Sequence, residues 1–171
     1  MVRIKNKIFR QVTIGILIAI GAALYLIESL IFFPVPLPGA RWGFSNLVVL
    51  ITAVNIGLYE TLMVSIGKSV VGGLISGRFG NIGFLIGLVG SVGAGIGMSM
   101  VHRVFKKNMG YMGISSIGAF LNNLIQISLI SLVLKNELVF YYLPYMTFLG
   151  IISAFINAFI SANIEGRFKE I

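Results

Sequence analysis

The run from Val12 to Phe33 contains one charged side chain, Glu28, and no proline. An apolar stretch of this length matches the roughly 20 helical residues that cross a bilayer core. No small-residue cleavage site ends the run, so we expect a retained transmembrane helix and not a signal peptide. Further apolar runs follow between polar segments. Together they predict six spans, at about 12–33, 44–58, 61–76, 82–101, 112–134 and 139–163.

The composition excludes a soluble domain. Hydrophobic residues make up 57% of the chain and charged residues only 11%, whereas soluble domains carry about 25% charged residues. We therefore predict an all-α integral membrane protein that forms a single transmembrane domain over residues 1–171. Cysteine is absent, which excludes disulfides and thiol chemistry.

The basic residues are distributed unevenly among the predicted loops. With six spans, one side of the membrane carries most of the cations, namely Arg3, Lys5, Lys7, Arg10, Arg103, Lys106, Lys107, Arg167 and Lys169. The other side has Arg41, Arg78 and Lys135. The positive-inside rule then predicts that both termini are cytoplasmic in a multi-pass protein of a bacterial or archaeal cell membrane. This topology explains the net charge of +8 without nucleic-acid binding.

Small residues recur every four positions on the first predicted helix, at Gly15, Ala19 and Ala23. At 3.6 residues per turn they form one stripe, which allows another helix to approach closely in lipid. The partner of this stripe is either a helix of the same chain or a separate protein subunit. Glu28 falls on roughly the opposite face of the helix, toward the expected bundle interior.

The fourth predicted helix has a comparable pattern, with Gly83, Gly87, Gly90, Ala94 and Gly97 at three- and four-residue spacing. No strand precedes it and no lysine-serine pair completes a Walker motif, so the pattern does not indicate a phosphate-binding loop. It indicates close helix packing.

Ionisable side chains within a membrane usually face an interior cavity. Glu28 and Lys68 are such residues, and polar groups of other segments lie at similar predicted depth. We therefore predict a solute-binding pocket, open to the outside, built from Glu28, Arg41, Trp42, Asn46, Lys68, Arg78, Asn122, Asn123 and Gln126. Three cations against one glutamate favour an anionic or zwitterionic ligand. The sequence gives no reason to expect a metal site.

Structural roles are open for the same residues. Arg41 and Arg78 would also suit helix ends that snorkel to the head groups. Glu28 and Lys68 would also suit an ion pair that only holds the fold. The three amides, Asn122, Asn123 and Gln126, share one broad helix face and would also suit hydrogen bonds between helices.

Three segments carry a family resemblance: "ESLIFFPVPLPGARWGFSNLVVL", "KSVVGGLISG" and "GAFLNNLIQ". They resemble the family labelled both "heptaprenyl diphosphate synthase component I" and "Gx transporter", over about residues 12 to 163. That family is similar in hydropathy and size to the substrate-binding S-components of energy-coupling factor (ECF) transporters. The resemblance implies six helices, an outward-facing site covered by the loop after the first helix, and a coupling subunit against Ala19 and Ala23. The family usually has a histidine in place of Asn122 and an arginine in place of Lys68.

The resemblance and the polar residues together lead to one expected function. We expect the substrate-binding membrane subunit of an ECF-type importer, with a coupling transmembrane subunit and ATPase subunits as partners. No ATP-binding motif exists in the chain, so we expect no cofactor here and ATP use by the partners. The expected solute is small, either a vitamin-like anion or zwitterion or an isoprenoid or quinone precursor.

The alternative is a non-catalytic accessory subunit of a prenyl diphosphate synthase in quinone biosynthesis. Synthases of the usual kind hold magnesium against diphosphate with aspartate-rich segments. The chain has no aspartate, so we do not expect it to be an enzyme by that chemistry.

Overall fold

The computed structural model describes residues 7–105 and 108–168, with side chains through residue 164. Within these residues the fold is all-helical and has no strand. The elements in chain order are α1 (Lys7–Leu30), α2 (Asn46–Asn55), α3 (Leu58–Ile75), α4 (Ile82–Phe105), α5 (Tyr111–Leu134), the 3-10 helix η2 (Glu137–Tyr142) and α6 (Leu143–Phe168).

Five helical segments are long and apolar enough to cross a membrane, and α2 is not among them. α2 is therefore shorter than the full-length span predicted at 44–58. With 10 residues, α2 is about 15 Å long, half of a bilayer core of roughly 30 Å. Every residue from Asn46 to Ala53 is buried, because α2 packs against each of the other five α-helices at the centre of the bundle.

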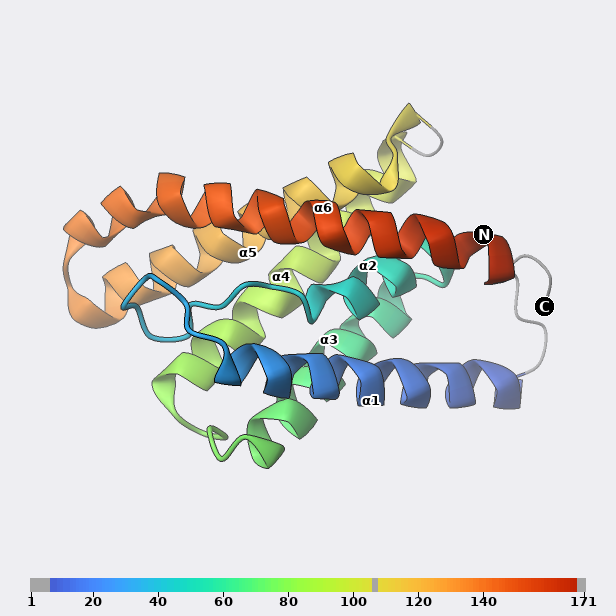
Figure 1. The fold of residues 1–171 in the computed structure, drawn as a ribbon, viewed down its shortest axis with the longest axis horizontal. Coiled ribbons are helices and arrows are strands. Elements are labelled where there is room, and N and C mark those ends of the chain that lie inside the picture. The colour runs from blue at the N-terminus through green and yellow to red at the C-terminus, as the bar shows by residue number, and fades with distance from the viewer. Residues whose placement is uncertain (1–6, 106–107, 169–171) are drawn as a thin grey trace.

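The segment 31–45 explains why α2 is short. α1 ends at Leu30 and not at the predicted Phe33, because Pro34 disfavours helical torsions in the residue before it. The chain then runs without regular structure between α1 and α6, and it begins α2 only inside the bundle (Figure 1). α1 and α6 make no direct contact in the part of the chain that the structure describes, so this segment and α2 fill the space between them.

Gly39 lets segment 31–45 approach α4 closely. Its φ of 82° lies in the left-handed region, which glycine adopts without strain. A Cβ added to Gly83 of α4 would lie 2.9 Å from the backbone nitrogen of Gly39. The glycine pattern of α4 therefore serves close packing, as predicted, and its partners include this segment as well as helices.

Two apolar clusters lie at different levels of the bundle. The first surrounds α2 and the early part of α1, and α4 and α5 contribute Met98 and Ile114 to it. The second contains Val35 of segment 31–45, with Ile86 of α4 and Ile130 of α5. Along α4 and α5 the buried residues between these clusters are polar or glycine, and they include Ser91 and Gln126. A buried polar layer therefore separates two apolar cores.

The small-residue stripe of α1 faces outward. Gly15, Ala19 and Ala23 are all exposed, and a Cβ added to Gly15 would meet no atom within 4 Å. Glu28, on the opposite face, is buried. The stripe is thus free for lipid or another subunit, and packing within the chain does not explain it.

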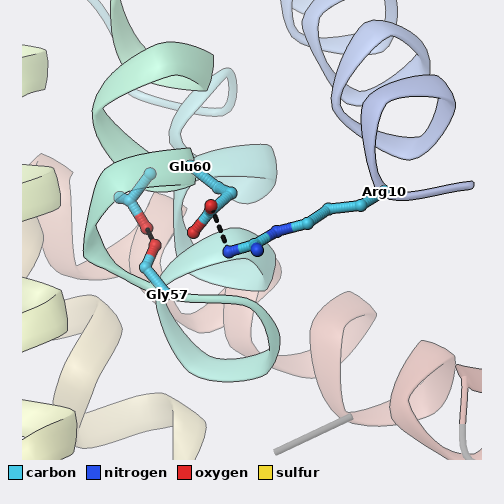
Figure 2. A network of polar contacts seen from close by, with 4 residues as sticks. Arg10, Gly57 and Glu60 are labelled. Carbon is cyan, nitrogen blue, oxygen red and sulfur yellow. Dashed lines mark hydrogen bonds and ion pairs between the residues drawn. The ribbon is translucent and has the colours of Figure 1, made fainter. Parts of the chain in front are cut away.

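α1 is joined to the α2–α3 turn by an ion pair. Arg10 of α1 reaches Glu60 in the first turn of α3, beside Gly57 (Figure 2). The start of α1 and the end of α6 lie at the same end of the bundle (Figure 1). Of the cations predicted to mark the cytoplasmic side, Arg3, Lys5, Lys106, Lys107 and Lys169 lie outside the described residues, and the side chain of Arg167 is likewise not described.

Candidate functional site

The polar layer is organised around the ammonium group of Lys68 on α3, whose side chain is 2% exposed. Its Nζ donates hydrogen bonds to Ser45 Oγ at 3.0 Å and to Asn46 Oδ1 at 2.9 Å. Ser45 and Asn46 stand at the start of α2, which begins at this depth because segment 31–45 enters the bundle. A residue on α3 is thus joined to a segment more than 20 positions earlier in the chain.

Glu28 contacts Ser45 and is not among the residues that line the chambers of the polar layer. Its Oε1 accepts a hydrogen bond from the Ser45 backbone N–H at 2.8 Å, and its Oε2 accepts one from Ser45 Oγ at 3.1 Å. The carboxylate therefore sits at the N-terminus of α2, where the helix dipole stabilises negative charge. Glu28 and Lys68 form no salt bridge within 4.0 Å among the ion pairs of the described residues. The Ser45 hydroxyl bridges them instead.

Arg41 has no comparable partner. Its guanidinium carbon lies 3.8 Å from the centre of the Tyr25 ring, a cation–π contact. Among the described residues no acceptor bonds the guanidinium, and the buried Nη1 has no hydrogen-bond partner. A Cβ on Gly87 would lie 2.2 Å from Arg41 Nη2, so the absence of a side chain at Gly87 makes room for this cation.

These groups surround an interior chamber of about 20 Å³. All the residues that line it are polar, charged or glycine: Arg41, Gly43, Ser45, Asn46, Lys68, Ser69, Gly87, Ser91, Asn122 and Gln126. Gln126 is 3% exposed, and its Oε1 has no hydrogen-bond partner. A buried acceptor of this kind costs free energy unless something bonds it, so the chamber is suited to a polar occupant.

A second chamber, of about 10 Å³, adjoins the first and shares Gly43, Asn46 and Asn122 with it. Trp42 and Asn123 line it. Asn123 Nδ2 donates to the Met146 carbonyl at 2.8 Å, and Asn157 Nδ2 donates to the Gly43 carbonyl at 3.1 Å. These two hydrogen bonds hold α6 against α5 and against segment 31–45. Asn123 and Asn157 therefore have a structural role.

Arg78 lies apart from the inner chambers. It lines an outer pocket of about 300 Å³ together with Arg41, Asn81 and Tyr25, and its Nη2 donates to the Ser29 carbonyl at 3.0 Å. The predicted site residues therefore line two separate spaces, the inner chamber and the outer pocket. Arg41 lines both.

Trp42 is held by aromatic neighbours. Its ring stacks on Phe44 with centroids 6.1 Å apart and meets Phe33 edge-on at 5.4 Å. Its Nε1 donates to the Phe32 carbonyl at 3.2 Å. These three aromatic residues belong to segment 31–45, and Trp42 borders the second chamber.

Sequence reasoning missed the serines of the chamber, Ser45, Ser69 and Ser91. Serine is common in transmembrane helices as a packing residue, so its presence gave no signal. Ser45 alone was recognisable in principle, since it precedes Asn46 where an apolar run begins after a proline-rich segment.

A family model matches residues 17–164, and its description is heptaprenyl diphosphate synthase component I. The chain belongs to this family. The matched range includes Glu28, Ser45, Lys68 and Gln126, so the whole polar layer lies within the part that defines the component I family. The resemblance noted from the quoted segments is confirmed. No curated protein and no solved structure gives a significant match to the chain.

Proposed function

We propose that this protein is a membrane-embedded binding subunit that captures a small polar solute in the layer between its two apolar cores. The observation that carries the proposal is the inner chamber, lined by polar side chains of segment 31–45, α2, α3, α4 and α5. Burying so many polar groups in an apolar bundle is costly unless they bond a partner. A bound solute supplies that partner.

The outward stripe of α1 supports a role as one subunit of a larger assembly. Gly15, Ala19 and Ala23 present a face without bulky side chains, which suits close contact with another transmembrane helix. We infer a coupling subunit of an ECF-type importer as this partner, with ATPase subunits supplying energy. In this arrangement the chain binds the solute and carries no catalytic group or cofactor. The basic end of the bundle faces the cytoplasm.

Mass spectrometry of small molecules retained after gentle purification in nanodiscs tests the proposal. We expect a retained solute in the wild type and its loss in Lys68→Met, while Arg78→Gln, altered in the outer pocket, serves as the comparison. A Lys68→Met variant that elutes as a folded monodisperse protein without the solute supports capture. Equal retention in all variants, or no retained solute in any, contradicts it.

A second candidate is an accessory membrane subunit of a prenyl diphosphate synthase. The family description favours it, because it names a component of such a synthase. Affinity purification of the tagged chain from native membranes separates the two candidates. Recovery of an ATPase with a coupling subunit supports the importer, and recovery of a soluble prenyl synthase subunit supports the accessory role.

A further inference from the structure

The chamber has an excess of positive charge, and that excess resides on Arg41. Lys68 and Glu28 are joined through the Ser45 hydroxyl, so their opposite charges lie on one continuous hydrogen-bonded chain. Arg41 has no acidic partner within 4.0 Å in the part of the chain that the structure describes. Two of the described acidic side chains have other partners. Glu28 accepts a hydrogen bond from the Ser45 backbone N–H, and Glu60 forms an ion pair with Arg10.

An arginine in this position is set up to bind an anion. Its guanidinium carries five N–H donors in a planar fork, and no described residue accepts a hydrogen bond from it. The Tyr25 ring supports the cation at 3.8 Å without using any of these donors. The donors remain available to a carboxylate or phosphate, which arginine binds in a bidentate geometry.

The remaining lining groups define the rest of the ligand. Gln126 Oε1 is a buried acceptor to which no described residue donates, so a polar occupant stabilises it better than an apolar one. Lys68 uses two of its three hydrogens on Ser45 and Asn46, which leaves one donor. The chamber has no apolar side chain in its lining. Filling it with a hydrocarbon would leave these polar groups unsatisfied.

Size limits the ligand as well. The chamber has a volume of about 20 Å³, which is room for about one or two atoms of water size. A long isoprenoid chain exceeds this space, and its apolar surface does not match the lining.

The geometry points to a compact, polar monoanion as the ligand of the inner chamber, with Arg41 as the residue that binds its anionic group. This inference rests on the proposed capture function and narrows it. It also excludes the isoprenoid precursors that the sequence left open as solutes.

Trp42, the single tryptophan of the chain, provides the test because it adjoins Arg41 and lines the neighbouring chamber. Iodide serves as a monoanionic quencher of its fluorescence and acrylamide as a neutral one, at constant ionic strength set with gluconate. For the wild type we expect saturable quenching by iodide. In Arg41→Gln the half-saturating iodide concentration should rise about tenfold or more. Arg103→Gln, at an exposed position near the end of α4, should stay within about twofold, and acrylamide quenching should be unchanged.

Glu28→Gln is a second variant for the same quenching experiment, and it keeps the shape of the side chain. It removes a negative charge next to the chamber, so the half-saturating iodide concentration should fall several-fold. Linear, non-saturating quenching in the wild type would overturn the inference. So would equal half-saturation in the wild type, Arg41→Gln and Glu28→Gln.

The two proposals fail in different ways. A neutral or prenylated molecule retained on the purified protein, without saturable iodide quenching, refutes the monoanion and leaves capture standing. Saturable, Arg41-dependent quenching without any retained solute supports the charge assignment and contradicts capture.

Discussion

At the scale of single residues, the polar layer depends on one hydroxyl. Ser45 Oγ accepts from Lys68 and donates to Glu28, so it connects two side chains that are each at most 3% exposed. Breaking a hydrogen bond to a buried charge costs more than breaking one between neutral groups. Ser45 is thus a structural residue for the two charges, while Arg41 is the residue that we propose binds the ligand.

We expect Ser45→Ala to lower the free energy of unfolding by about 1–3 kcal/mol, because both buried charges lose a hydrogen bond. Thermal unfolding of the protein in nanodiscs measures this change. Ser128→Ala is the matched control, since the Ser128 hydroxyl is exposed and bonds the Leu124 carbonyl of its own helix. Equal melting temperatures for the two variants would show that the bridge contributes nothing to stability.

At the scale of elements, α1 has two faces with different tasks. Its inner face contributes Leu17, Tyr25 and Glu28 to the interior. Its outer face carries the small-residue stripe, and Arg10 near its start is bound to Glu60 of α3. The ion pair holds the helix in one orientation, and the stripe therefore points consistently away from the bundle.

Replacing Ala19 or Ala23 by phenylalanine should abolish copurification with the coupling subunit, because a bulky side chain prevents close helix approach. Solute retention and the melting temperature should stay close to wild type, since both positions are exposed. Leu132→Phe on α5, where the leucine is 75% exposed, is the control for a bulkier lipid-facing side chain. An intact complex with Ala19→Phe and Ala23→Phe would assign the stripe to lipid.

At the scale of the whole molecule, five long helices and a central half-length helix form the bundle. The start of α1 and the end of α6 share one end of the bundle (Figure 1). Because segment 31–45 is not helical, its polar backbone reaches the interior of the bundle, where Asn157 bonds the Gly43 carbonyl.

The chain has no cysteine, so single cysteines give a clean test of orientation. We expect Glu137→Cys, at the start of η2, to react with a membrane-impermeant maleimide in intact cells. Lys7→Cys, at the start of α1, should react only after the membrane is permeabilised. The reverse pattern would place the basic end outside and contradict the positive-inside assignment.

Several features could be predicted from the sequence because they depend on local patterns. Hydropathy predicted the long helices to within a few residues, and helical periodicity predicted that Glu28 and the Ala19 stripe lie on opposite faces. The amide cluster on α5 was recognised from its spacing, and all three amides are buried. The family was recognised from three short segments.

Only the tertiary structure decided which segments far apart in the chain contact each other. Hydropathy cannot distinguish a short buried helix from part of a span, because both are apolar, and so α2 was predicted as a full-length span. Nor can it show that Ser45 lies between Glu28 and Lys68, or that Arg41 lies over Tyr25 without an acid nearby. The sequence by itself determined which residues are costly to bury in a membrane, since that cost belongs to each side chain. Their pairing depended on the path of segment 31–45, and that path left Arg41 without a partner.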